Sequence, residues 1–260
     1  MENKVSGICV VVPTYCNAGT LGNVLRRIAV HVGDIIVVND GSKDETCRVL
    51  DEAACDLAAS GTNLTVVHHD RNRGKGQALR TGFRAAAEAG FTHVLTIDSD
   101  GQHFPEDIPL FLEAIRRHPE AIIIGSRNIQ SENMPGKNTF ANKFSNFWFM
   151  LQTGKKLADT QTGFRAYPLA GVRGTSLMTS RYEAELELLV FSAWCGTDIV
   201  PIPIRVYYPP EDERVTHFRP FADFARISVL NTFLCIGAAV YGLPSILLRK
   251  LFHCKSGGRS

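Results

Sequence analysis

Two aspartates one residue apart, Asp98 and Asp100, directly follow the apolar run Val94–Ile97. In an extended segment, side chains alternate between two faces, so these carboxylates are expected to point the same way. Hard oxygen ligands of this kind suit Mg²⁺ or Mn²⁺, which bind through a few carboxylates together with substrate phosphates. A solvent-exposed acidic turn is the alternative interpretation, and the rest of the sequence has to decide between them.

The elements that would position this pair alternate strictly between apolar β-rich runs and helical patterns. The predicted strands are Ile8–Val12, Asp34–Val38, Leu64–His68, Val94–Ile97 and Ile122–Ile124, and the predicted helices are Thr20–Val30, Asp44–Ala59, Gly76–Ala89 and Asp107–Arg117. Near-continuous apolar strands are typical of a parallel sheet that is buried on both faces. We therefore predict an α/β fold with a mostly parallel sheet and flanking helices, whose ligands bind at the carboxyl ends of the strands.

The other strand ends carry polar residues that suit a nucleoside diphosphate. Asp40 can accept hydrogen bonds from a base or a ribose, although a plain turn aspartate would look the same. Lys75, between Gly74 and Gly76, opens a predicted helix, where backbone N–H groups and an ammonium favour an anion. The spacing is not that of a Walker A loop, and a dinucleotide-binding glycine pattern is missing after the first strand.

Composition limits the remaining classes. The net charge of +2 and the lack of a basic run with interleaved aromatics argue against a nucleic-acid partner. The 7 cysteines are scattered without a Cys-x-x-Cys pair, which favours reduced packing cysteines in a cytosolic domain. The first residues lack the apolar core of a signal peptide, so none is expected.

Several short motifs occur together and in order. They are Val12-Pro13-Thr14-Tyr15, Val38-Asn39-Asp40-Gly41-Ser42, Asn72-x-Gly74-Lys75-Gly76, Asp98-Ser99-Asp100, Gly125-Ser126-Arg127, Asp159–Arg165 and Thr216–Pro220. With them the chain resembles the family 2 glycosyltransferases of the GT-A fold, in particular the polyprenyl (dolichyl) phosphate mannosyltransferase branch. The resemblance covers roughly residues 5–222, and it implies an inverting, metal-dependent hexosyltransferase.

The resemblance also implies residue roles. The nucleotide sugar would be bound by Pro13, Thr14, Tyr15, Asn17, Asp40, Lys75, Asp98 and Ser99. His217 and Arg219, with Arg214, lie in a loop that could close over the diphosphate, and a solvated basic loop is the alternative interpretation. Asp98, Asp100 and Gln102 would hold Mg²⁺ or Mn²⁺. Asn17 follows Cys16 where the branch commonly has a glutamate, so GDP-mannose and UDP-glucose both remain possible donors.

The acceptor decides which further groups are needed. A lipid phosphate is already an anion and needs cations beside Asp98 and Asp100 rather than a base, and Arg127, Lys143 and Arg165 are the candidates. A sugar hydroxyl on a glycolipid or polysaccharide would need a base, which Glu183 or Glu185 could supply, although a solvated helix face is the favoured interpretation of that pair. A non-catalytic scaffold that binds nucleotide sugars at a membrane is a third hypothesis, which the metal-ligand set disfavours.

The C-terminal part differs from the rest. Ile227–Leu248 contains no charged residue and is long enough to cross a bilayer as a helix. A buried core helix and a single crossing are alternatives, but the denser positive charge follows the segment, and Gly237, Gly242 and Pro244 offer breaks. We therefore expect a catalytic domain over residues 1–222 and, over 223–260, a membrane-associated hairpin with both ends on the cytoplasmic face.

Overall fold

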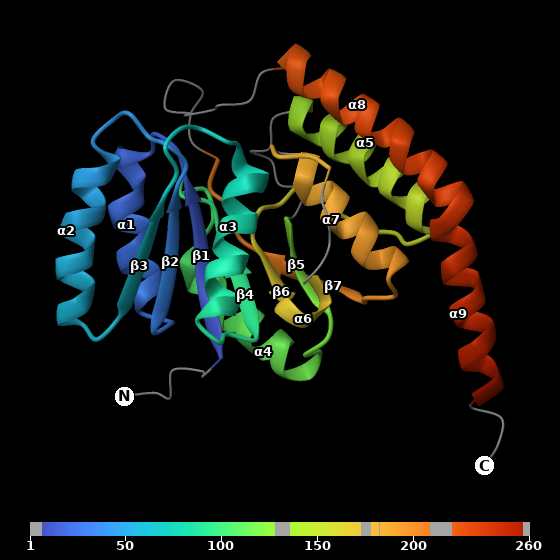
Figure 1. Cartoon of the computed structure of the whole chain (residues 1–260), viewed down its shortest axis with the longest axis horizontal. Coiled ribbons are helices and arrows are strands. Elements are labelled where there is room, and N and C mark those ends of the chain that lie inside the picture. Colours follow the sequence, from blue (N-terminus) through green and yellow to red (C-terminus); the bar gives the residue numbers. More distant parts are fainter. Residues whose placement is uncertain (1–6, 128–135, 173–177, 182, 209–219, 257–260) are drawn as a thin grey trace.

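The computed structural model describes residues 7–127, 136–172, 178–181, 183–208 and 220–256 (Figure 1). These residues build one seven-stranded sheet with the strand order β3-β2-β1-β4-β6-β5-β7. Helices cover both of its faces, and the last helix leaves the body at one end. The predicted α/β class with a mostly parallel sheet is confirmed.

The first half of the sheet follows the predicted alternation. Its elements are β1 (Ile8–Thr14), α1 (Ala18–Ala29), β2 (Asp34–Asn39), α2 (Thr46–Ala59), β3 (Asn63–His68), α3 (Lys75–Glu88) and β4 (His93–Thr96). β1 lies parallel to both β2 and β4, and β2 lies parallel to β3. The carboxyl ends of these four strands therefore meet at one edge.

The second half contains one strand that the sequence did not reveal. Its elements are the 3-10 turn η1 (Pro105–Asp107), α4 (Ile108–Arg117), β5 (Ile122–Arg127), α5 (Gly136–Thr153), β6 (Arg165–Pro168), α6 (Leu169–Val172), α7 (Glu183–Trp194) and β7 (Ile199–Ile204). β6 lies between β4 and β5 and runs antiparallel to both. It has four residues, among them an arginine and a proline, so it lacks the apolar β-branched run that marks the other strands.

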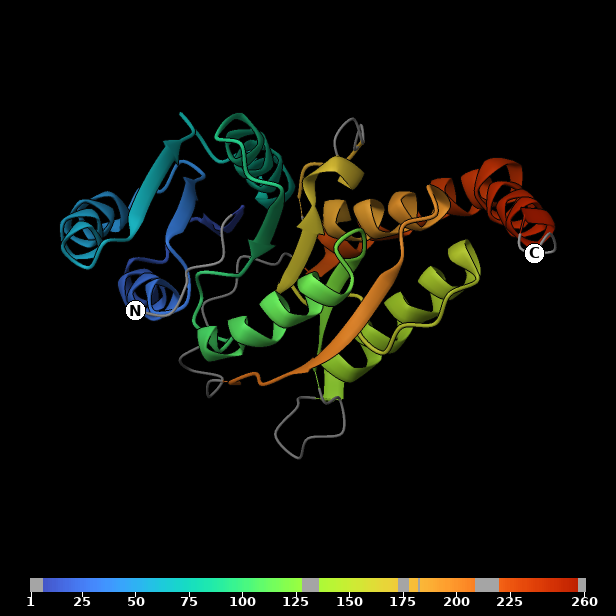
Figure 2. The same ribbon diagram turned by 90° about the horizontal axis from the view of Figure 1, so that it is seen from below.

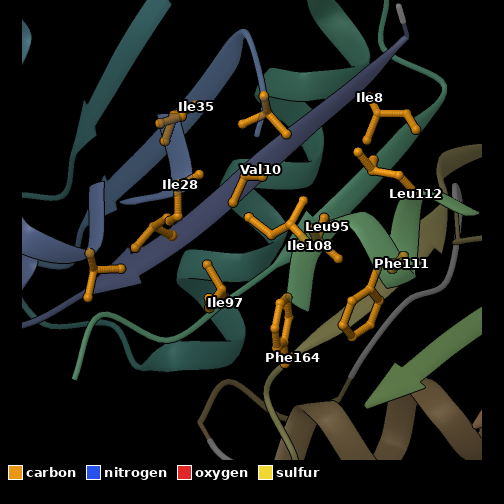
Figure 3. Packing of buried hydrophobic residues seen from close by; sticks show 14 of the residues in the cluster. Ile8, Val10, Ile28, Ile35, Leu95, Ile97, Ile108, Phe111, Leu112 and Phe164 are labelled. Atoms are coloured by element: carbon orange, nitrogen blue, oxygen red, sulfur yellow. The ribbon is translucent and has the colours of Figure 1, made fainter. Parts of the chain in front are cut away.

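The core lies on the two faces of the sheet because successive strand residues point to opposite sides. Val10 and Val12 face the layer formed by α1, α2 and α4, whereas Cys9 and Val11 face α3. In Figure 3 the first of these clusters draws side chains from β1, α1, β2, β4 and α4 together, with Phe164 at its edge. Phe111 and Phe164 stack there at 4.2 Å between ring centroids, which ties α4 to the segment that leads into β6.

The C-terminal helix does not form the expected hairpin. α8 (Pro220–Gly237) continues through a π-helical segment, η3 (Ala238–Gly242), into α9 (Leu243–Ser256) without a reversal of the chain. A Cβ at Gly237 would lie 2.9 Å from the Trp194 ring, and one at Gly242 would lie 2.3 Å from Trp194 Nε1. The two glycines therefore allow close packing on Trp194 rather than a turn.

One face of this helix packs on α5 and α7, and the other is exposed. Leu230, Leu234 and Ala238 are buried against that side of the domain. Residues 226–249 are long and apolar enough to cross a membrane, but only 28% of that window is buried. The expected division between residues 222 and 223 falls in the first turn of α8 and stays a prediction.

Candidate active site

The acidic pair lies in a turn just beyond the carboxyl end of β4, not within the strand. The strand ends at Thr96, and Gly101 follows the pair with φ +76°. The Gln102 backbone N–H donates to Asp100 Oδ1 at 3.0 Å, which closes the turn. The alternation argument for the two carboxylates therefore did not apply, because it requires an extended chain.

Asp98 is already paired in this structure. Lys75 Nζ lies 2.7 Å from Asp98 Oδ1 and 2.8 Å from Glu185 Oε2, so one ammonium bridges two carboxylates. Burial opposes the charge of Asp98, yet the charge and the hydrogen bond of Lys75 outweigh it and hold its pKa below the usual value. Burial likewise opposes the charge of Lys75, and its two carboxylate partners nevertheless raise its pKa.

The surroundings of Asp100 favour a bound cation. Burial first, and the charge of Asp98 second, raise its pKa to about 6. Two carboxylates that repel each other in a poorly solvated turn favour a divalent cation, and Gln102, which closes the same turn, carries a neutral amide oxygen that could add to them. Among the described residues no group of three His, Cys, Asp or Glu side chains is clustered tightly enough for a closed metal site. The donor set therefore fits Mg²⁺ or Mn²⁺ held jointly with phosphates rather than an all-protein cage.

Gly163 closes the back of this site. A Cβ at this position would lie 2.3 Å from Asp98 Oδ2 and 2.8 Å from Lys75 Nζ. Its carbonyl accepts a hydrogen bond from Thr96 Oγ1 at 2.8 Å, so the loop before β6 is tied to β4. Only a glycine allows the backbone to approach the ion pair this closely.

The end of β1 lies next to the same turn. Asn17 Nδ2 donates to Ser99 Oγ at 2.8 Å, and Thr20 Oγ1 donates to the Ser99 carbonyl at 2.6 Å. Pro13 and Thr14 are buried, and Tyr15 is half-buried. Thr14 Oγ1 has no hydrogen-bond partner among the described residues, and such a buried hydroxyl at a strand end is a group that a ligand can satisfy. Of the predicted nucleotide residues of this segment, Asn17 is thus brought to Ser99, the neighbour of Asp98 along the chain.

Asp40 is buried and bonded to the protein at both oxygens. It accepts from the backbone N–H groups of Arg73 and Gly74, each at 2.8 Å, and lies 2.6 Å from His69 Nδ1. His69 Nε2 lies 2.9 Å from Thr81 Oγ1 on α3. The Asp40 carboxylate therefore holds the loop that leads into Lys75 in place. Its pairing with His69 was not apparent from the sequence.

Two of the predicted phosphate-binding arginines are held by the protein itself. Arg127 binds Asp159 through Nε and Nη2, at 2.5 and 2.9 Å. Arg165 is fully buried, and its guanidinium donates to the carbonyls of Thr160, Thr162 and Glu185. Arg165 thus ties the loop before β6 to α7, and an acceptor phosphate would have to displace these bonds. The third candidate, Lys143 on α5, is exposed.

The acidic start of α7 is buried, so the expectation of a solvated helix face is wrong. Glu183, Glu185 and Glu187 all lie inside the protein. Glu187 accepts from the backbone N–H groups of Met178 and Thr179 at 2.6 and 2.9 Å. Glu183 Oε2 has no hydrogen-bond partner in the described part of the chain. The positions of these glutamates along the sequence do not reveal that the packing of α7 against α3 buries them.

His103 is a neighbour of Asp98 that sequence reasoning missed, although it directly follows Gln102. Its Nε2 lies 4.0 Å from Asp98 Oδ2, and its ring packs on Phe164. Burial lowers its pKa to about 4, so it is neutral at physiological pH. Of the remaining predicted residues, His217 and Arg219, and Arg214 with them, lie outside the described residues.

Comparison with known proteins gives a consistent family. Residues 9–177 match the model of glycosyl transferase family 2. The UDP-N-acetylglucosamine–dolichyl-phosphate N-acetylglucosaminyltransferase of Methanococcus voltae is 30% identical over 77% of this chain and 86% of its own length. The undecaprenyl-phosphate mannosyltransferase of Micrococcus luteus is also 30% identical, over 76% of this chain and 82% of its own length.

Solved structures agree on the fold at lower sequence identity. The S. aureus protein TarS in complex with UDP-GlcNAc superposes with a TM-score of 0.60 at 17% identity, over 92% of this chain and 69% of that one. A mannosyltransferase of Pyrobaculum calidifontis in complex with GDP-Man and Mn²⁺ gives a TM-score of 0.59 at 17% identity, over 97% of this chain and 81% of that one. These likenesses concern the fold alone.

Proposed function

The chain belongs to glycosyltransferase family 2, with a GT-A fold, and from this premise we propose that it transfers a hexose from a nucleotide sugar to a polyprenyl phosphate. The transfer would invert the configuration at the sugar carbon and use Mg²⁺ or Mn²⁺. The acceptor would be reached at the cytoplasmic face of a membrane.

The observation that carries this proposal is the charged turn after β4. Asp98 and Asp100 lie there beside Lys75, the first residue of α3, at the edge where β1, β2 and β4 end. A divalent cation on this pair would neutralise the leaving diphosphate, and the ammonium and helix N-terminus favour the same anion. Thr14, with its unsatisfied hydroxyl, borders the place where the nucleotide would lie.

The lipid acceptor is supported by the relatives and by the exposed helix. Two relatives are named for transfer to dolichyl or undecaprenyl phosphate. A phosphate acceptor attacks as an anion, so the site needs cationic side chains that position the phosphate rather than a general base. In this scheme Arg127 borders the acceptor, while Arg165 acts as a positioning residue for the loop around Gly163.

The membrane would be met by the free face of α8–η3–α9. Because Leu230 and Leu234 pack on the domain, this helix lies along the protein and is better placed to lie in the membrane surface than to cross it alone. In this arrangement the lipid acceptor would reach the site from the membrane surface.

A second candidate function is transfer to a sugar hydroxyl, which one observation favours. Glu183 is buried at the start of α7, and Oε2 has no hydrogen-bond partner among the described residues, as a general base awaiting a hydroxyl would. Glu183→Gln separates the two functions, because it would abolish transfer to a hydroxyl and leave transfer to a phosphate largely unchanged.

The decisive experiment uses the full chain in detergent with polyprenyl phosphate and labelled GDP-mannose, UDP-glucose or UDP-N-acetylglucosamine. The expected product is a labelled lipid that mild acid cleaves, since a glycosyl phosphate is acid-labile. Asp100→Asn should lower the rate about 100-fold or more, because a metal supplies several kcal/mol of charge stabilisation. A product that resists mild acid, or full activity of the variant, would contradict the proposal.

A further inference from the structure

Lys75 pairs with Asp98, the carboxylate that a divalent cation would also bind. Its ammonium lies 2.7 Å from Asp98 and 2.8 Å from Glu185, so it is shared almost equally between the two carboxylates. Both partners are largely buried, with side-chain exposures of 24% and 8%. A charge of this kind is held by the protein and is not a mobile surface lysine.

The surroundings allow Lys75 little freedom. The Gly163 backbone blocks one side of the pair, as shown by the 2.8 Å between a Cβ at that position and Lys75 Nζ. Gly74 precedes Lys75 with φ +93° and packs on the Ser180 carbonyl, so the start of α3 is fixed against the segment before α7. Glu185 comes from the first turn of α7, and its Oε1 is buried without a hydrogen-bond partner in the described chain.

We infer that Glu185 is a positioning residue: it retains Lys75 when a divalent cation takes up Asp98, so that the lysine stays beside the diphosphate instead of competing for the aspartate. This inference rests on the proposed function, in that it requires a cation at Asp98. Glu185 acts through Lys75 and does not itself touch substrate.

The physical reason is the cost of an unpaired buried charge. A cation on Asp98 repels the ammonium, which then needs another anionic partner, because a buried charge without one is strongly destabilising. Glu185 is that partner before nucleotide binds. Once the diphosphate is present at the N-terminus of α3, it can replace Asp98 as the second anionic partner of the Lys75 ammonium.

Mn²⁺ binding to the full chain without nucleotide tests this, by electron paramagnetic resonance or calorimetry. Glu185→Gln should weaken Mn²⁺ binding about tenfold, and Lys75→Met should strengthen it about tenfold, as expected for members of one charge network. In the Lys75→Met background, Glu185→Gln should change the affinity less than about twofold, because Glu185 acts only through Lys75.

Glu187→Gln is the matched control, since it removes a buried carboxylate from the same helix that binds the Met178 and Thr179 backbone instead of Lys75. Its Mn²⁺ affinity should remain within about twofold of the parent. Melting curves establish that each variant folds. If Lys75→Met does not fold, the difference in Mn²⁺ affinity between Glu185→Gln and Glu187→Gln still tests the inference. Equal effects of those two variants, or equal effects of Glu185→Gln in both backgrounds, overturn the inference alone. A parent chain that binds no Mn²⁺ without nucleotide also overturns the inference alone, because the proposed function still allows the cation to bind together with the diphosphate.

Discussion

At the scale of single residues, the site depends on a position that carries no side chain. Gly163→Ala would place a methyl group 2.3 Å from Asp98 Oδ2 and 2.8 Å from Lys75 Nζ. Overpacking of this kind costs about 1–3 kcal/mol of unfolding free energy, and a displacement of about 1 Å at reacting groups can cost about 100-fold in rate. We expect a folded protein with at least that loss of transfer, measured as kcat/KM beside a urea unfolding curve.

Gly19→Ala is the matched control for this substitution. A Cβ at Gly19 meets nothing within 4 Å, and the residue lies in α1 with ordinary helical geometry. Alanine favours a helix over glycine by up to about 1 kcal/mol, so activity should be unchanged and stability equal or slightly higher. If Gly163→Ala were as active as Gly19→Ala, the close approach would have no role in the site.

The residue types of the site could be predicted, but their partners could not. Asp98, Asp100 and Lys75 were predicted for one edge because parallel strands place their carboxyl ends together. Burial and contacts across the fold were not predictable, so Glu185 was taken for a solvent-exposed residue and the pairing of His69 with Asp40 was missed. Such contacts depend on how α3 and α7 pack, and local sequence carries little information about that.

At the scale of elements, an ion pair joins α1 to the turn that follows the acidic pair. Arg27 donates to Glu106 through Nε at 2.8 Å and Nη2 at 2.6 Å, and this hydrogen bonding lowers the pKa of Glu106 to about 2. A folded pKa below the unfolded value of about 4.3 stabilises the protein above that pH and is lost as the pH falls towards 2. Because Glu106 is 43% exposed, solvent screening limits the effect to about 1 kcal/mol or less.

Glu106→Gln therefore has a pH-dependent cost. Its unfolding free energy should lie below that of the parent by about 0.5–1 kcal/mol at pH 6, and the two curves should converge as the pH falls from about 4.5 towards 2. Denaturant unfolding at pH 6, 4 and 3 measures this. A difference that stays constant over that range would show that the pair acts by packing and not by charge.

A second prediction at this scale concerns the packing of the π-helical segment η3 on Trp194. Gly242→Ala would place a methyl group 2.3 Å from Trp194 Nε1, which itself donates to the Gln152 carbonyl at 2.8 Å. We expect a loss of about 1–3 kcal/mol of unfolding free energy and a shift in tryptophan fluorescence. Trp194→Phe in the same chain should restore part of the loss, because the smaller ring leaves room for the methyl group. Two losses that simply add would mean that the contact is not what holds η3.

Element order was largely predictable, whereas the elements that depend on tertiary contacts were not. The strands β1 to β5 and the helices α1 to α4 follow from periodicity because each has a long apolar pattern. β6 is short and pairs antiparallel between two longer strands, so only the sheet reveals it. The same holds for α8–η3–α9, whose glycines are break signals in the sequence and packing residues against Trp194 in the fold.

At the scale of the whole molecule, apolar surface gathers at one end. Figure 2 shows the C-terminal helix at the end of the molecule opposite α1 and α2. Exposed apolar side chains follow its outer face: Val229, Phe233, Ile236, Val240, Tyr241, Leu243, Leu247 and Leu248. Phe147 and Leu151 add to them from α5, which packs beside α8. An apolar surface of this length on one side of a helix is typical of an element that lies in a membrane interface.

Replacing this surface should therefore release the protein from lipid without unfolding it. Phe233 and Val240 are 60% and 76% exposed, so Phe233→Ser with Val240→Ser removes few contacts within the protein. Burial of each side chain in lipid is worth about 1.5–3 kcal/mol, so each change should weaken binding to phospholipid vesicles about tenfold or more. Val30→Ser, at a residue that is 77% exposed beside α1 at the other end, is the matched control and should leave binding unchanged. Flotation of the full chain with vesicles measures both, and full retention of the double variant would show that the outer face of α8–η3–α9 does not contact the membrane.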